Sequence, residues 1–176
     1  MLMWLLVGCR TGHRQQPVVR ETIYDAAQVG NIAKVEQSLK KGVDVNAKDE
    51  NGMTPLWSAA SQSRRDMVNF LITQGADVNA RYRDGWTLLM VAAVLNQLDM
   101  KFLVANGADV NARNNDSWTP LMFAADNGHL DAVKLLVENG ADVNARTKEG
   151  LTPLMIAAKK GHQAVLDFLK QHGATE

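Results

Sequence analysis

Apolar and polar positions follow one another along the chain in blocks that recur about every 33 residues. In residues 118–150, a Thr-Pro pair opens the block and suits the N-cap and first position of a helix. Two runs with apolar residues at helical spacing follow, and each ends at a glycine, Gly128 or Gly140, that suits a left-handed helix end. The polar stretch 142–150 then closes on Glu149-Gly150, as expected at a loop tip. The block predicts a helix, a turn, a second helix and a projecting hairpin.

The hexapeptide GADVNA marks the period of these blocks. Its first glycine stands at positions 42 (in the variant GVDVNA), 75, 107, 140 and, in a truncated copy, 173, so successive copies are 33, 32, 33 and 33 residues apart. A fixed period in this range indicates stacked supersecondary units, and such units must stack because two short helices cannot bury an apolar face alone. We therefore expect repeats at about 21–52, 53–85, 86–117, 118–150 and 151–176.

These motifs closely resemble the ankyrin repeat. The resemblance rests on Thr-Pro-Leu beginning at Thr54, Thr119 and Thr152, on Gly-His at 128–129 and 161–162, and on the GADVNA tags. It covers about residues 21–176 and implies an all-α fold, an ankyrin-repeat solenoid of stacked helix-turn-helix units with projecting β-hairpin loops. Polar residues on the outward positions of the first and last units are expected of capping repeats.

The departures from the family pattern concentrate in the middle of the chain. Leu88 replaces the helix-starting proline of the third unit, which is also one residue short, and we expect the loss in the turn around Asn96-Gln97. Ser63-Arg64 replaces Gly-His in the second unit. The usual histidine after Thr-Pro-Leu is replaced in four units, by Trp57, Met90, Met122 and Met155. We therefore expect the third unit to be the least regular.

Composition limits the possible functions. The 176 residues fit one domain, and 19 basic against 19 acidic residues give no support for a nucleic-acid binder. A single cysteine excludes an intramolecular disulfide framework. No apolar run approaches the length of a transmembrane helix.

Residues 1–20 are interpreted as a lipoprotein-type signal segment and tether. Leu6-Val7-Gly8-Cys9 resembles a bacterial lipobox, in which the cysteine thiol is lipidated. The charged n-region is missing and the apolar segment is short, defects that a translation start upstream of Met1 would explain. Two alternatives stay open, an apolar turn packed on the first unit and a plain cleaved signal. With lipidation at Cys9, we expect a bacterial envelope protein facing the periplasm or the exterior; otherwise we expect a cytoplasmic or secreted protein.

Several residues that recur once in each unit could be metal ligands or catalytic groups, and each is better explained by a structural role. The tag carries one aspartate and one asparagine in each unit, too far apart to share a metal ion, and we expect both side chains to bond nearby backbone within their own turn. His129 and His162 are expected to bond backbone, and the Met90, Met122 and Met155 stripe to fill core space. No catalytic or phosphate-binding motif is present, so we expect no cofactor, no metal and no enzyme activity.

Two in-phase series point to a binding surface. In ankyrin proteins, the residue before the helix-starting threonine lies at the junction of hairpin and helix and faces the concave groove. Here it is large and apolar in four units, namely Met53, Trp86, Trp118 and Leu151. Each hairpin opens with a cation, namely Lys48, Arg81, Arg113 or Arg146, and Tyr82 follows where the family often has aspartate. We expect the Trp86 and Trp118 indoles to lie exposed and side by side, flanked by the arginines.

The sequence thus predicts a non-catalytic protein–protein interaction module, monomeric, whose partner is another protein and neither a cofactor nor a nucleic acid. A membrane contact would come only through a lipid on Cys9. Two other interpretations stay open, a soluble adaptor and an inhibitor or immunity-type accessory of an enzyme. Aromatic and arginine enrichment is typical of interface hot spots but does not name a ligand.

Overall fold

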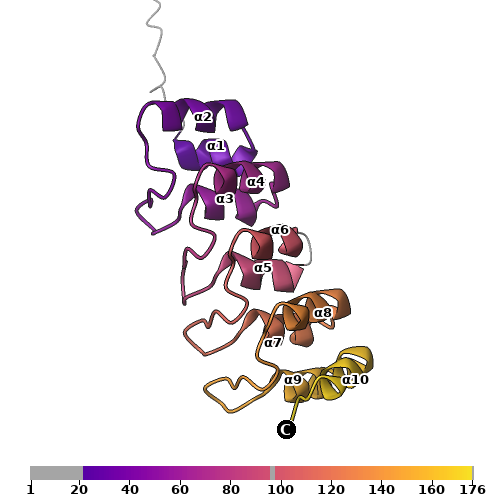
Figure 1. The fold of residues 1–176 in the computed structure, drawn as a ribbon. Coiled ribbons are helices and arrows are strands. Elements are labelled where there is room, and N and C mark those ends of the chain that lie inside the picture. Colours follow the sequence, from indigo (N-terminus) through magenta and orange to yellow (C-terminus); the bar gives the residue numbers. More distant parts are fainter. Residues whose placement is uncertain (1–21, 96–97, 176) are drawn as a thin grey trace, which may run out of the picture.

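A computed structural model describes residues 22–95 and 98–175. Within these ranges the chain forms helices that follow one another as five antiparallel pairs, here called units 1 to 5 (Figure 1). The helices are α1 (Ile23–Val29), α2 (Ile32–Lys40), α3 (Pro55–Ser61), α4 (Arg65–Thr73), α5 (Leu88–Leu95), α6 (Met100–Ala105), α7 (Pro120–Asp126), α8 (Leu130–Glu138), α9 (Pro153–Lys160) and α10 (Gln163–Gln171).

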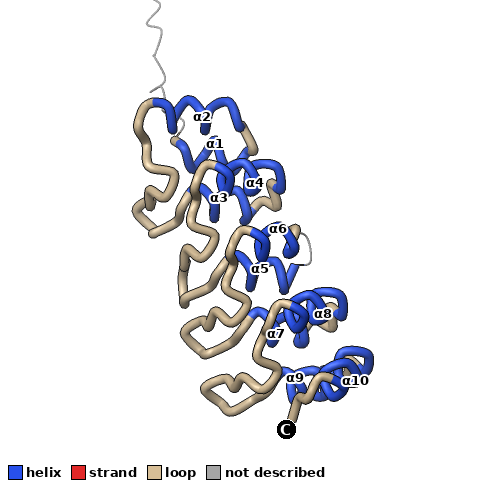
Figure 2. Tube along the Cα trace, viewed as in Figure 1, coloured by secondary structure: helices blue, strands red, loops and turns tan. Residues whose placement is uncertain are grey.

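The units stack in one direction, and their long connecting loops all project from the same side (Figure 2). The odd-numbered helices lie nearest these loops, and the even-numbered helices pack behind them (Figure 1). One apolar cluster runs through the stack from Ile23 to Leu169, so each unit completes its core against its neighbours. The expected all-α repeat solenoid is confirmed. We call the surface made by the loops and the odd-numbered helices the inner face.

Threonine caps begin the inner helices, with one exception. The hydroxyl of Thr54 accepts a hydrogen bond from the amide of Trp57 at 3.3 Å, and Thr119 and Thr152 cap α7 and α9 in the same way. In unit 3 the Thr87 hydroxyl is buried and has no partner among the residues that the structure describes. The first helix of unit 3 therefore lacks both the threonine cap and the proline with which the first helices of units 2 and 4 begin.

The asparagine of each GADVNA tag joins its unit to the next one. The Asn79 amide donates to the carbonyl of Gly107 at 2.8 Å, and its oxygen accepts from the amide of Asp109 at 2.8 Å. The same pair of bonds, to the unit that follows, is made by Asn46, Asn111 and Asn144. The expectation of bonds within each turn was therefore wrong for asparagine. It is confirmed for the tag aspartates, whose carboxylates accept from the amide two residues on.

The projecting loops are closed more by side chains than by β-pairing. The backbone amide of Asn114 donates to the carbonyl of Trp118. The side-chain oxygen of Asn114 accepts a hydrogen bond from the backbone amide of Trp118 at 2.8 Å. Asp49 and Thr147 close their loops with the same pattern. Tyr82 has no such oxygen, so its backbone carbonyl accepts from Trp86 instead. In the described ranges this pair is the one isolated β-bridge, so the expected β-hairpins are largely irregular loops.

Unit 3 is the least regular, as expected. Its second helix, α6, has 6 residues, whereas α2, α4, α8 and α10 have 9 each. The predicted site of the missing residue, Asn96-Gln97, lies outside the described residues. Helices α3 and α5 also pack less closely against each other than the other pairs of neighbouring inner helices do. The indole of Trp57, on α3, donates to the carbonyl of Ala80 in the loop between units 2 and 3 at 3.1 Å.

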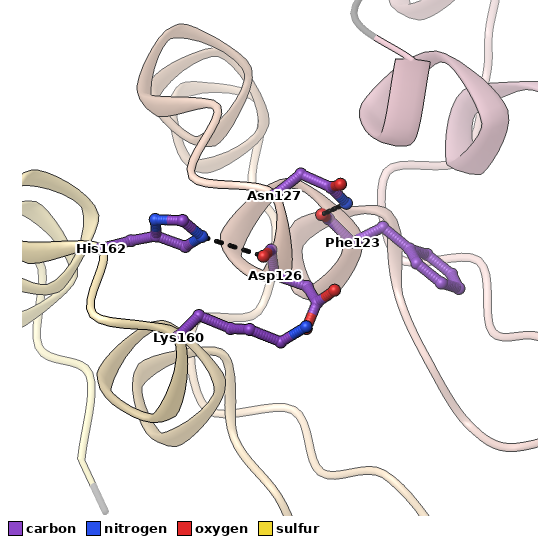
Figure 3. A network of polar contacts seen from close by, with 5 residues as sticks. All are labelled: Phe123, Asp126, Asn127, Lys160 and His162. Atoms are coloured by element: carbon purple, nitrogen blue, oxygen red, sulfur yellow. Dashed lines mark hydrogen bonds and ion pairs between the residues drawn. The ribbon is translucent and has the colours of Figure 1, made fainter.

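Histidines join the C-terminal units at the turn between the two helices. The His162 ring lies 3.0 Å from the backbone carbonyl of Asp126, and Lys160 pairs with the Asp126 carboxylate at 3.1 Å (Figure 3). His129 contacts the carbonyl of Ala93 at 2.9 Å, so the expected backbone role of both histidines is confirmed. Arg64, which replaces histidine in unit 2, donates to the Gln28 carbonyl at 3.2 Å and so makes the same connection.

Candidate functional site

Three aromatic rings from two units form a continuous cluster on the inner face. The Trp86 ring lies 4.4 Å, centroid to centroid, from the ring of Phe123, which projects from α7. The Trp118 ring contacts the same phenylalanine at 5.0 Å. All three side chains are half-buried. The geometry is that of tilted aromatic pairs, which are favourable beyond the area that they bury.

Phe123 is the site residue that sequence reasoning missed. We expected the indoles of Trp86 and Trp118 to lie exposed and side by side, and they are instead half-buried and bridged by the phenylalanine between them. The sequence does contain this difference, because the same helix position holds Asp25, Ser58, Val91 and Ile156 in the other four units and a phenylalanine only here. A ring at this position reaches the loop residues of its own unit and of the unit before.

The remaining apolar residues of the series differ in their surroundings. Trp118 and Leu151 pack, half-buried, against a small core cluster of Met122, Ala145 and Ile156. Met53 is also half-buried, and its sulfur accepts a hydrogen bond from the Ser58 hydroxyl at 3.2 Å. The apolar series is therefore partly embedded in the inner face, with one half-buried member in each of units 2 to 5.

A second aromatic group lies next to the first along the stack. Tyr82, on the loop between units 2 and 3, packs its ring 5.2 Å from the indole of Trp57. The guanidinium of Arg83 lies 5.3 Å from the centroid of the Tyr82 ring, within the range of a cation–π contact. Tyrosine in place of the family's aspartate thus extends the aromatic surface toward unit 2.

The arginines that open the loops are exposed and linked to one another. The guanidinium of Arg81 donates to the backbone carbonyl of Arg113 at 2.7 Å, and Arg113 donates to the carbonyl of Arg146 in the same way. Arg146 turns back to the carbonyl of Gly150 in its own loop at 2.9 Å. This chain of bonds could not be predicted from the sequence, because it depends on the spacing between stacked loops. The bonds hold each cation in place while its charge stays at the surface.

Two methionines of the predicted stripe have a more specific role than filling space, whereas Met155 is half-buried. The sulfurs of Met90 and Met122 lie 3.5 and 3.4 Å from the amides of Thr87 and Thr119, at the N-cap of their own helices. Both side chains are fully buried. Each sulfur accepts a hydrogen bond from a backbone amide that would otherwise lack a partner at the helix start. Family members carry histidine at this position.

Features of other functional classes are sparse in the described part of the chain. Within it, no three His, Cys, Asp or Glu side chains gather closely enough to hold a metal ion. No helix described there has the length and apolar character needed to cross a membrane. Cys9, the predicted lipidation site, lies outside the described residues.

Comparison with known proteins agrees with this architecture. A family model described as "Ankyrin repeats (3 copies)" matches residues 23–114 and 98–175. The mouse (Mus musculus) protein "2-5A-dependent ribonuclease" is 38% identical over 69 residues, which are 38% of this chain and 9% of that protein. The "Ankyrin repeat domain-containing protein oryK" of Aspergillus oryzae (strain ATCC 42149 / RIB 40) is 37% identical over 51 residues, 29% of this chain and 8% of that protein.

The family match covers nearly all of the described helices, whereas the two relatives are matched over less than a tenth of their length. A match of that extent to a ribonuclease does not carry the activity of the whole enzyme, and ankyrin repeats are generally non-catalytic modules for protein–protein interaction. The stacked helix pairs, the Thr-Pro-Leu caps and the asparagine ladder agree with the family match, and the chain belongs to the ankyrin-repeat family.

Proposed function

We propose that the chain binds another protein through the inner face, with the cluster of Trp86, Phe123 and Trp118 at the centre of the contact. The observation that supports this proposal is the clustering of three half-buried rings at one place in the stack. A repeat needs only small side chains at the Phe123 position, as Ser58 shows in unit 2. Aromatic residues that shed their remaining exposed surface on binding are typical hot spots.

The surroundings of the cluster suit a protein partner. Leu151, Met53 and Tyr82 extend the apolar surface along the stack, and the arginine chain of Arg81, Arg113 and Arg146 borders it. Because the arginines are held by backbone carbonyls, ordering them on binding costs little conformational entropy. The expected complex is non-catalytic and contains one copy of this chain.

Site-specific photo-crosslinking tests which face is used. A benzophenone amino acid at Leu95, the 45% exposed last residue of the inner helix α5, should crosslink a partner in the native cell. The same probe at the exposed Lys101, on the second helix of the same unit, is the matched control. Crosslinks at Leu95 that vanish when Trp86 is changed to alanine support the proposal. Crosslinks that occur only at Lys101 would move the site to the opposite face.

We also propose that the domain is tethered in a bacterial envelope by a lipid on Cys9. What supports this is the sequence Leu6-Val7-Gly8-Cys9 and the stretch of 12 residues, 10–21, that precedes the described part. Fully extended, such a stretch reaches about 40 Å, enough to hold the first unit clear of a membrane surface. More than one acyl chain on the cysteine would be needed for stable anchoring.

Metabolic labelling with a fatty-acid probe tests the tether. The natural gene, with its own upstream region, should yield labelled protein in the membrane fraction, and Cys9→Ala should abolish both the label and the fractionation. Unlabelled wild-type protein of unchanged mass would overturn the tether and leave the binding proposal intact.

A further inference from the structure

The ends of the inner face carry opposite charge. On unit 1 and the loop that follows it, Asp25, Asp49 and Glu50 line one shallow cavity together, with Lys48 as the opposing cation. The pKa of the Tyr24 hydroxyl, at the same place, is raised, first by burial and then by the carboxylates of Asp49 and Asp44. The three carboxylates of the cavity, together with the smaller part of the Tyr24 shift that Asp49 and Asp44 cause, indicate a negative potential at the N-terminal end.

The C-terminal end has the reverse balance. Lys159 and Lys160 lie in the last turn of α9, and Lys148 lies at the tip of the loop before it. Lys160 is matched by the Asp126 carboxylate at 3.1 Å, while Lys148 and Lys159 are exposed and have no ion-pair partner within the described ranges. Glu149 is the one exposed carboxylate at this loop tip. The cations therefore prevail at this end.

The two charged ends act independently of each other. Neighbouring units are roughly 10 Å apart, so unit 1 and unit 5 are separated by about 40 Å. Screening at physiological salt reduces interactions between exposed charges beyond about 8 Å. A bound segment would thus meet a negative field at one end of the face, the aromatic cluster further along, and a positive field at the other end.

We propose that the inner face binds a protein segment of defined polarity, with basic residues over unit 1, a large apolar side chain against Trp86 and Phe123, and acidic residues over unit 5. Charge complementarity favours this occupant, and the proposal rests on the proposed binding function of the same face. An extended segment of about 12 residues spans the required distance at roughly 3.3 Å per residue. Complementary ends fix the direction of binding and exclude partners with like charge at either end.

Three synthetic peptides of about 16 residues test the polarity. They share a Leu-Leu-Phe centre and carry lysines at one end and glutamates at the other, lysines at both ends, or glutamates at both ends. We expect the charge-separated peptide to bind the full chain roughly three- to tenfold more tightly than the other two, because each exposed ion pair contributes modestly. The Lys148→Glu/Lys159→Glu variant should instead prefer the peptide with lysines at both ends.

A nitroxide label on the charge-separated peptide reports its direction. Placed at the lysine end, it should broaden the NMR signals of Glu50 and Asn51, and placed at the glutamate end, those of Lys148 and Lys159. Equal affinities for the three peptides, or broadening at both ends from either label, would overturn the polarity; if binding is still lost in Trp86→Ala, the proposed function stands. Absence of binding, or binding unaffected by Trp86→Ala, would overturn both.

Discussion

The indole of Trp86 packs against the ring of Phe123, 4.4 Å away between centroids, although the two residues belong to different units and lie 37 positions apart in the chain. Trp86 has a ring contact with Phe123 and is not embedded in either core cluster. Trp118, which contacts the same phenylalanine, packs in addition on the core beneath it. Because of this difference, a change at Trp86 is the better probe of binding. A change at Trp118 is expected to affect both binding and the stability of the fold.

The two tryptophans should therefore separate stability from binding. We expect Trp118→Ala to lower the free energy of unfolding by about 2 kcal/mol, since a half-buried aromatic loses its packing, and Trp86→Ala by about 1 kcal/mol or less. Urea denaturation followed by circular dichroism measures both values. A larger loss in Trp86→Ala than in Trp118→Ala would show that the Trp86 indole is the more important for the fold.

The asparagine ladder should contribute measurably to the coupling between units. Asn111 donates to the Gly140 carbonyl and accepts from the Asp142 amide, so Asn111→Ala breaks two bonds across one boundary, at a cost of about 2 kcal/mol. Asn139→Ala, which breaks one bond to the Leu135 carbonyl in its own helix, is the control and should cost less. Equal losses of unfolding free energy in the two variants would contradict a coupling role for the ladder.

Ser117 offers a stabilising substitution. It adopts a left-handed conformation, φ 62°, at a loop position that holds glycine in the other loops, at Gly52, Gly85 and Gly150. Ser117→Gly should raise the free energy of unfolding by about 1 kcal/mol, because glycine adopts this conformation without the steric cost of a Cβ atom. Ser117→Ala removes the hydroxyl but keeps the Cβ atom, and it should give no gain in thermal or urea denaturation. A gain as large in the alanine variant would contradict this explanation.

Unit 3 should open before its neighbour. Helix α5 starts without a threonine cap, and α6 is three residues shorter than α8. We expect the amides of α6 to exchange with solvent faster than those of α8 in hydrogen-exchange mass spectrometry, because local opening follows local stability. Equal or slower exchange in α6 than in α8 would contradict the lower local stability of unit 3.

The capping box of α1 should give unit 1 a modest acid sensitivity. Hydrogen bonds from the Thr22 hydroxyl, at 2.6 Å, and from its amide, at 2.9 Å, lower the pKa of Asp25 below its ordinary value of 3.8. A carboxylate with a lowered pKa in the folded state stabilises that state above 3.8, and the contribution is lost as the pH falls through the lower value. The stability difference between wild type and Asp25→Asn should therefore shrink between about pH 5 and about pH 3. A difference that grows on acidification would contradict the assignment.

The sequence predicted the parts of this fold that depend on spacing along one chain. The 33-residue period, the threonine caps and the irregular third unit follow from residues close to one another in sequence. The bridging position of Phe123, the bonds from each tag asparagine to the next unit and the Arg81–Arg113 link depend instead on the separation and rotation of stacked units. Those quantities result from packing across the whole interface, which a period does not specify.

We propose that the inner face binds protein through the Trp86–Phe123 pair. The most direct measurement is the affinity of a crosslink-identified partner for wild type, Trp86→Ala and the opposite-face control Lys101→Ala, by calorimetric titration. We expect Trp86→Ala to weaken binding by roughly 2 kcal/mol while its circular dichroism spectrum stays unchanged, and Lys101→Ala to bind as wild type does. Wild-type affinity in a folded Trp86→Ala variant would contradict the claim.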